Sequence, residues 1–160
     1  MQGHNAHIHF FDAANSHNVP SGVYAAVPVD GRFAWSPAEV RRMHKVIRYT
    51  VLGGADAAHR ARGIDIEFGD RANDPDFYVP FLRERLLHYG DATPYVNRSN
   101  RPTVESHCRE AGVDTHKFLW WESTLDGTIM QDVWATQFQG GIRAGFDLSL
   151  LQGVDNFHRP

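Results

Sequence analysis

Eight short runs of β-branched, aromatic and other apolar residues, separated by polar segments, constrain the fold of this chain more than any other feature. Each run has the length and composition of a β-strand. The runs cover residues 7–11, 23–27, 46–52, 63–67, 93–97, 117–122, 133–138 and 146–150. Strands that alternate with helices or loops are typical of an α/β fold, so the sequence predicts a parallel (β/α) barrel of the TIM type.

The length of the chain limits the size of this barrel. Full barrels usually need about 200 residues or more, whereas this chain has 160. We therefore expect a compact, partly reduced barrel in which several helices are missing or shortened to loops. The barrel domain is expected to cover residues 1–154, and residues 155–160 are expected to form a loose tail.

Three of the segments between the predicted strands contain clear helix starts. Ser36 precedes Pro37 and stands three residues before Glu39, which is the pattern of a capping box and predicts a helix to about residue 44. A second helix is predicted over 74–88, where an Asp-Pro pair opens the segment and a glycine lies just past its end. A third is predicted over 100–111.

The composition argues against several functional classes. The 16 basic and 19 acidic residues give a net charge of −3, so we expect no nucleic-acid or anionic-membrane partner. The single cysteine, Cys108, excludes an intrachain disulfide and a cysteine metal cluster. No run approaches the roughly 20 apolar residues that span a bilayer. The first residues lack a basic segment followed by an apolar run, so we expect synthesis in the cytoplasm without a signal peptide.

The most informative chemical motif is Ile64-Asp65-Ile66-Glu67. Alternate residues of a strand share a face, so Asp65 and Glu67 are predicted to project together while the isoleucines pack on the other side. Neighbouring carboxylates repel each other, so the pKa of one of them is expected to rise. A carboxyl group that keeps its proton near neutral pH can act as a general acid, as glycosidases require. The alternative is a surface strand with two solvated acids.

Other polar and aromatic side chains stand near the ends of predicted strands, where a parallel barrel places its active site. They are Asp12, Tyr95, Asn97, Trp121, Glu122, Gln137, Phe138 and, at the start of the last strand, Asp147. Flat aromatic faces stack on pyranose rings, so this set predicts a sugar ligand. The alternatives are that strand ends are polar because loops begin there, and that the aromatic residues belong to the core.

The order of these motifs resembles that of the family 25 glycoside hydrolases, the lysozyme-type muramidases often carried by phages. The resemblance includes an early Asp (Asp12), the central Asp-x-Glu, a Tyr-x-Asn strand (Tyr95, Asn97), a Trp-rich strand, a Gln-aromatic strand and a final Asp (Asp147). Phe11-Asp12-Ala13-Ala14-Asn15 and Phe146-Asp147-Leu148-Ser149 are similar to a shorter branch found in actinobacteria and their phages. Glu122 departs from the pattern, because the family usually has an uncharged residue there.

The resemblance implies acid-assisted hydrolysis of bacterial cell-wall glycan without a cofactor. Glu67 would be the general acid, and Asp65 would raise the pKa of Glu67 and stabilise positive charge on the sugar. Asp12 and Asp147 would shape the site and orient the substrate. The implied substrate-binding residues are Tyr95, Asn97, Trp121, Gln137 and Phe138. The protein would act at the bacterial cell wall or as part of a phage particle, with other virion proteins as partners.

Two other hypotheses remain open on the sequence alone. His7 and His9 share a strand face and could bind zinc, as in metal-dependent amidohydrolases, but no further histidine has a clear strand-end position, so no metal site is predicted. The second hypothesis is a barrel without activity that keeps a glycan-facing surface. It would serve as a structural component of a phage virion or as a cell-wall adhesin.

Overall fold

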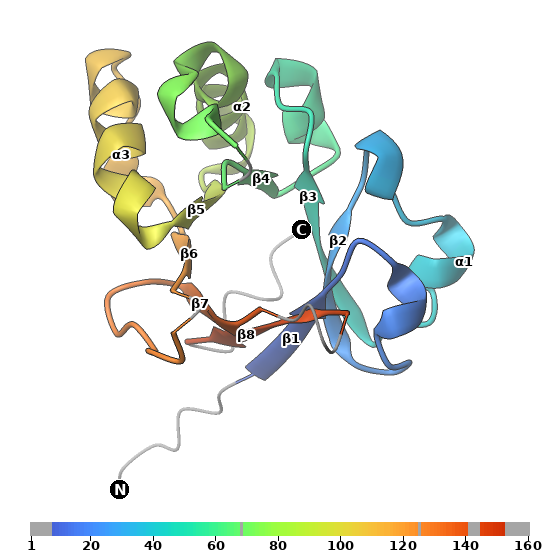
Figure 1. Ribbon diagram of the computed structural model, residues 1–160. Coiled ribbons are helices and arrows are strands. Elements are labelled where there is room, and N and C mark those ends of the chain that lie inside the picture. The colour runs from blue at the N-terminus through green and yellow to red at the C-terminus, as the bar shows by residue number, and fades with distance from the viewer. Residues whose placement is uncertain (1–7, 68, 125, 141–144, 153–160) are drawn as a thin grey trace, which may run out of the picture.

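The computed structural model describes residues 8–67, 69–124, 126–140 and 145–152, which form a closed barrel of eight strands (Figure 1). The strands follow one another around the barrel in chain order. They are β1 (Ile8–Asp12), β2 (Tyr24–Pro28), β3 (Lys45–Thr50), β4 (Gly63–Asp65), β5 (Thr93–Asn97), β6 (Trp121–Ser123), β7 (Ala135–Gln139) and β8 (Asp147–Leu151). Each predicted strand overlaps one of these, so the number and order of the strands are confirmed. The sixth strand starts at Trp121 and not at residue 117, because Thr115–Lys117 form a 3-10 turn.

The described residues contain three α-helices, which are α1 (Pro37–Val40), α2 (Pro75–Tyr89) and α3 (Arg101–Glu110). Figure 1 shows α2 and α3 on the side of β4 and β5, and α1 on the side of β2. The helix α2 ends at Gly90, whose left-handed conformation (φ 80°) suits a residue without a Cβ. Most of the other connections are loops with short 3-10 turns.

The direction of the last strand overturns the predicted fold class. The strands β1 to β7 pair in parallel, whereas β8 pairs antiparallel with both β7 and β1. The structure is therefore a closed, mixed β-barrel with few helices. The prediction of an α/β fold with a parallel (β/α) barrel of the TIM type is wrong.

The short connection before β8 explains the reversal. Residues 140–146 separate β7 from β8, whereas a crossover between parallel strands needs about a dozen residues or more. A strand that returns antiparallel can be reached by a much shorter loop. The spacing of the last two predicted strands was therefore already incompatible with a parallel eighth strand.

The capping box before α1 is confirmed, but the helix is shorter than predicted. The Ser36 hydroxyl accepts a hydrogen bond from the Glu39 backbone at 3.3 Å, and the Glu39 carboxylate accepts one from the Ser36 backbone at 2.6 Å. The backbone N–H of His44 already donates to Val23 at 2.8 Å, beside β2. The chain has therefore left the helix before residue 44, in order to enter β3.

Apolar side chains fill the barrel and also the space between the barrel and its helices. The interior cluster is Phe10, Ala26, Ile47, Tyr95, Trp121, Trp134, Ala135 and Leu151. A larger cluster lies between the barrel wall and the helices α2 and α3. It contains Ile64, Ile66 and Val96 from the barrel and Cys108 from α3. Burial raises the pKa of the Cys108 thiol to about 12. A third cluster around Trp35 lies beneath α1.

Glu122, the residue that departs from the family pattern, is explained by α3. Its side chain is only 2% exposed, and Arg101 at the start of α3 donates to it at 2.5 Å. The guanidinium of Arg101 also lies 4.8 Å from the centre of the Trp120 ring. A buried carboxylate needs such a partner, because removing the charge from water is costly. The negative charge on β6 therefore ties α3 to the barrel.

We predict that Arg101→Met destabilises the protein strongly, because it leaves the Glu122 carboxylate buried without its partner. Loss of one partner of a buried pair typically costs about 3–5 kcal/mol. Denaturant unfolding measures this loss, with Arg109→Met on the exposed part of the same helix as the control. The double variant with Glu122→Gln should recover much of the stability. An Arg101→Met protein as stable as its parent would contradict this view of the ion pair.

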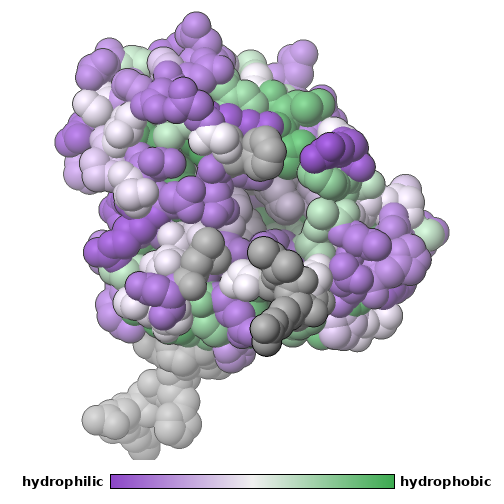
Figure 2. All heavy atoms as spheres, viewed as in Figure 1, coloured by the Kyte–Doolittle hydropathy of each residue, from purple (hydrophilic) through white to green (hydrophobic). Residues whose placement is uncertain are grey.

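The face of the molecule drawn in Figure 2 is largely polar. Figure 2 shows hydrophilic residues over most of the face that it presents, with smaller apolar areas between them. Within the part of the chain that the structure describes, none of the helices combines the length and the apolar character that a membrane crossing requires.

Candidate functional site

Four acidic side chains meet in one pocket of about 460 Å³ at the carboxyl ends of the parallel strands. Asp12 is the last residue of β1, and Asp65 is the last residue of β4. Glu67 follows two residues after Asp65, and Asp147 is the first residue of β8. Their roles in binding or catalysis stay predictions, but the structure brings all four together.

The antiparallel direction of β8 is what brings Asp147 to this pocket. The register pairs Asp147 directly with Asp12 across the β1–β8 seam. Because β8 runs in the opposite direction, its first residue lies level with the last residue of β1. In a parallel eighth strand, Asp147 would lie at the other end of the barrel.

The alternation predicted for the Asp-x-Glu motif is observed. Ile64 and Ile66 are fully buried in the cluster between the barrel wall and the helices, whereas Asp65 and Glu67 line the pocket. The backbone N–H of Glu67 donates to the Asp65 carboxylate at 2.9 Å. This bond holds the Asp65 carboxylate against the backbone of Glu67.

The pKa of Glu67 is raised above its usual value, as expected for one member of the pair, but the main cause differs from the expectation. Burial contributes most, and the negative charge of Asp65 contributes less. The hydroxyl of Tyr95 hydrogen-bonds the Glu67 carboxylate and opposes the rise. Glu67 is therefore poised to hold a proton above the pH at which an exposed glutamic acid would lose it.

Asp12 is the most deeply buried acid of the pocket, with 7% of its surface exposed. Its pKa lies well above the usual value, first because of burial and then because of the charge and hydrogen bond of Asp147. A hydrogen bond between two carboxyl groups requires a proton on one of them. Oδ2 of Asp12 has no hydrogen-bond partner among the described residues. The pocket therefore contains two acids whose pKa is raised, mainly by burial.

An aromatic stack forms the floor of the pocket. Tyr95 and Tyr49 line the pocket, and the Tyr95 ring stacks on Trp121 with centroids 4.0 Å apart and planes at 25°. Trp121 is fully buried, and its indole N–H donates to the Ser149 hydroxyl at 3.0 Å. Trp121 was predicted to bind substrate, but the structure places it below Tyr95, where it supports the floor.

The other three predicted substrate-binding residues do not line the pocket. Asn97 lines a neighbouring cavity of about 690 Å³, together with Ser123 and Thr124. Gln137 is 2% exposed and is paired in register with Ser123. Phe138 lies on the outer face of the barrel against His9, with ring centroids 6.1 Å apart. Alternation along β7 explains this result, because Phe138 must point away from the face that its neighbour Gln137 occupies.

His7, which was half of a possible zinc pair, lies outside the described residues. The other half, His9, is exposed on β1. In the described part of the chain, the pocket contains no histidine.

Sequence reasoning missed the rim of the pocket, which is formed by Arg32, Phe33, Leu52 and Arg71. Arg32 and Phe33 belong to a 3-10 turn, Gly31–Phe33, that follows Asp30. Asp30 anchors this turn to the end of β3, since it accepts hydrogen bonds from the Thr50 hydroxyl at 2.5 Å and the Val51 backbone at 2.8 Å. The signal was the Asp30-Gly31 pair, which starts two residues after the end of β2 and favours a turn at the barrel mouth.

Comparisons with known proteins give no assignment for this site. No protein-family model matches the sequence, and no curated protein or solved structure gives a significant match.

The raised pKa of Asp12 predicts how stability depends on pH. The folded protein keeps a proton that the unfolded chain loses near a pKa of about 3.9. The contribution of protonated Asp12 to the free energy of unfolding is therefore fully present below that pH. It is lost as the pH rises through the pKa that Asp12 has in the folded protein. Asp12→Asn keeps a donor toward Asp147 without the charge. We expect its Tm to exceed that of the parent by about 2–4 °C at pH 8, the shift that 1 kcal/mol produces in a domain of this size.

Thermal unfolding between pH 4 and pH 8 measures this effect, and the gap between variant and parent should narrow as the pH falls. Asp56→Asn, at an exposed position, is the control. An Asp12→Asn protein that is less stable than its parent at pH 8 would show that Asp12 is not held in the neutral form.

The bond between Tyr95 and Glu67 gives a second prediction. Tyr95→Phe removes a hydrogen bond that favours the charged form of Glu67, so the pKa of Glu67 should rise further. Carboxyl ¹³C NMR titration of the protein measures this pKa directly. Tyr89→Phe, at the end of α2, should leave it unchanged. A fall in the pKa of Glu67 in Tyr95→Phe would refute the assigned bond.

Proposed function

We propose that this protein is a glycoside hydrolase of the lysozyme type that acts on bacterial cell-wall glycan. The observation that supports this best is a single pocket that contains Glu67, with a raised pKa, beside three further carboxyl groups. Glycoside hydrolysis typically uses two carboxyl groups that flank the scissile bond. One is a carboxylic acid and the other is a carboxylate. The order of the motifs, which resembles that of the family 25 glycoside hydrolases, supports the same reaction.

Glu67 is the proposed general acid. Its burial favours the protonated form, and the Tyr95 hydroxyl orients the carboxyl group. In the reaction, Glu67 donates this proton to the glycosidic oxygen as the bond to the anomeric carbon breaks. The electron pair of that bond leaves with the oxygen, and positive charge develops on the sugar ring. Water then adds to the anomeric carbon and returns a proton to the Glu67 carboxylate, which completes the hydrolysis.

Asp65 is the proposed partner that stabilises this positive charge. The Glu67 backbone N–H bonds to the Asp65 carboxylate and holds it beside the acid. Asp147 and Asp12 share a hydrogen bond across the β1–β8 seam. In this proposal, they bind and orient sugar hydroxyl or acetamido groups, because a carboxyl pair that shares a proton can both donate and accept hydrogen bonds.

The surroundings of the pocket suit a chain of sugars. Phe33 and Leu52 provide apolar surface at the rim, and Leu52 is 60% exposed. A second cavity starts at Asn97, two residues along β5 from Tyr95. In the proposal, the pocket binds the sugar at the scissile bond and the second cavity accepts neighbouring units. The protein would act at the bacterial cell wall or within a phage particle.

Glu67→Gln tests the proposal, because it keeps the shape of the side chain but removes the proton that is transferred. We expect this change to lower the hydrolysis of purified cell walls by at least about a hundredfold, the usual scale of general acid catalysis. Release of reducing sugar and clearing of turbidity are measured at matched folded fractions. Glu110→Gln, an exposed position at the end of α3, is the control.

Two outcomes would contradict the assignment in different ways. Equal activity of Glu67→Gln and its parent would remove Glu67 from the mechanism. A parent protein that binds cell-wall glycan but hydrolyses none would instead favour a catalytically silent glycan-binding component of a virion. Glycan pull-down of both proteins separates these two cases, since binding should survive in Glu67→Gln.

A further inference from the structure

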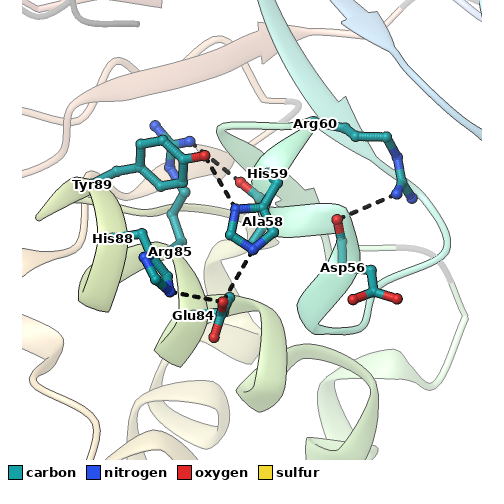
Figure 3. A network of polar contacts seen from close by, with 8 residues as sticks. All are labelled: Asp56, Ala58, His59, Arg60, Glu84, Arg85, His88 and Tyr89. Carbon is teal, nitrogen blue, oxygen red and sulfur yellow. Dashed lines mark hydrogen bonds and ion pairs between the residues drawn. The ribbon is translucent and has the colours of Figure 1, made fainter.

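A second group of polar side chains lies on the outside of the barrel, where a 3-10 turn packs against α2 (Figure 3). The carboxylate oxygen Oε1 of Glu84 contacts two imidazole rings. It lies 3.1 Å from Nε2 of His59 and 3.0 Å from Nε2 of His88. One ligand atom from each of the three residues lies within 4.8 Å of the other two. No other group of three histidine, cysteine or acidic side chains among the described residues meets this condition.

The local structure explains why the three side chains converge. Glu84 and His88 are four residues apart on α2 and therefore lie one above the other on the same helix face. His59 is the last residue of the turn Ala55–His59, which holds Ala57 and Ala58 in the core against α2. Two separate elements of the chain thus present three ligands of two types, imidazole and carboxylate, that zinc commonly uses.

A second set of contacts orients His59. Its Nδ1 lies 3.2 Å from the Tyr89 hydroxyl. When Nδ1 carries the proton and donates it to that oxygen, the lone pair of Nε2 points toward Glu84 and is available to a metal. Tyr89 is itself held in place, because the Arg85 guanidinium lies 3.9 Å from its ring centre and pairs with Asp91. Histidine ligands of metals typically have such a partner at the second ring nitrogen.

We infer that His59, Glu84 and His88 form a binding site for a divalent transition metal ion, with zinc as the best match. Two imidazole nitrogens and one carboxylate oxygen supply three of the four ligands of tetrahedral zinc. The side chains of His59 and His88 are 47% and 49% exposed, so water can supply the fourth. Without a metal, the same three groups form a hydrogen-bonded network. When zinc binds, the imidazole nitrogens coordinate the ion, and these hydrogen bonds are replaced by metal–ligand bonds.

The site lies at the opposite end of the barrel from the carboxylate pocket. The helix α2 starts after the carboxyl end of β4 and ends just before β5 begins, so His88 lies near the amino ends of these strands. His59 also precedes β4. A metal ion here would cross-link the turn to α2 and stabilise the fold, and it would contribute nothing to chemistry in the pocket. This inference therefore does not depend on the proposed glycosidase activity.

Zinc binding to the full-length protein tests the inference. The protein is freed of metal with a chelator and titrated with Zn²⁺ at pH 7.5 by calorimetry, and then with Co²⁺ to observe ligand-field absorption. We expect one zinc ion per chain and Co²⁺ bands typical of tetrahedral coordination. Because a metal bound only to the folded state stabilises it, the Tm should rise by about 5–10 °C at a hundredfold excess of zinc over its Kd.

Variants then identify the site. His59→Ala and His88→Ala should each weaken zinc binding by at least about a hundredfold and abolish the Co²⁺ bands. Tyr89→Phe, which removes only the orienting hydroxyl, should weaken zinc binding by about tenfold, the lower end of the usual range for such partners. His9→Ala removes an exposed histidine of the other candidate pair and should have no effect.

Unchanged zinc affinity in His59→Ala and His88→Ala would overturn the inference, as would loss of binding in His9→Ala. Absence of binding at millimolar zinc would also overturn it and leave the three residues as a hydrogen-bonded network.

Discussion

The pairing of β8 with both β1 and β7 is the constraint on which the rest of the structure depends. It closes the sheet in the antiparallel direction, so none of the eight described strands has an open edge. Closure creates an interior that must be filled, and Trp121 and the rings around it fill the interior. The reversed direction also places Asp147 beside Asp12. The strand pairing that closes the barrel therefore also brings together the four acidic side chains of the pocket.

Bringing four acidic side chains into one pocket is electrostatically unfavourable. Burial raises the pKa of Glu67 and Asp12, and each further negative charge in the pocket adds to the repulsion. The barrel tolerates this arrangement because rigid aromatic packing supports it from below and because a proton can bridge Asp12 and Asp147. Sites that bind or transform ligands commonly contain such unfavourable groups, and the stability is recovered elsewhere in the fold. Here the apolar layer under α2 and α3 packs against the outer side of the barrel wall, and the pair of Arg101 and Glu122 joins α3 to β6.

The sequence predicts the strands well because period-two alternation and turn residues are local signals. It identifies Asp65 and Glu67 as neighbours on one face for the same reason. Strand direction is not a local property, and the prediction of a parallel eighth strand failed although the seven residues 140–146 were too few for a crossover. The prediction for Phe138 was wrong because neighbouring residues of a strand point to opposite faces. Gln137 and Phe138 could therefore not both face the pocket. The roles of Trp121 and Glu122 depend on partners far away in the chain, Tyr95 and Arg101, which no local pattern reveals.

The position of Cys108 has a practical consequence. Its thiol is buried beneath α3, and burial raises its pKa to about 12, so almost no reactive thiolate exists in the native protein at neutral pH. Alkylating reagents can reach the sulfur only when α3 separates from the barrel. Because the sequence contains no other cysteine, the rate of thiol labelling reports the opening of this one helix. The chain thus carries an intrinsic reporter of local unfolding at the wall that supports the acidic pocket.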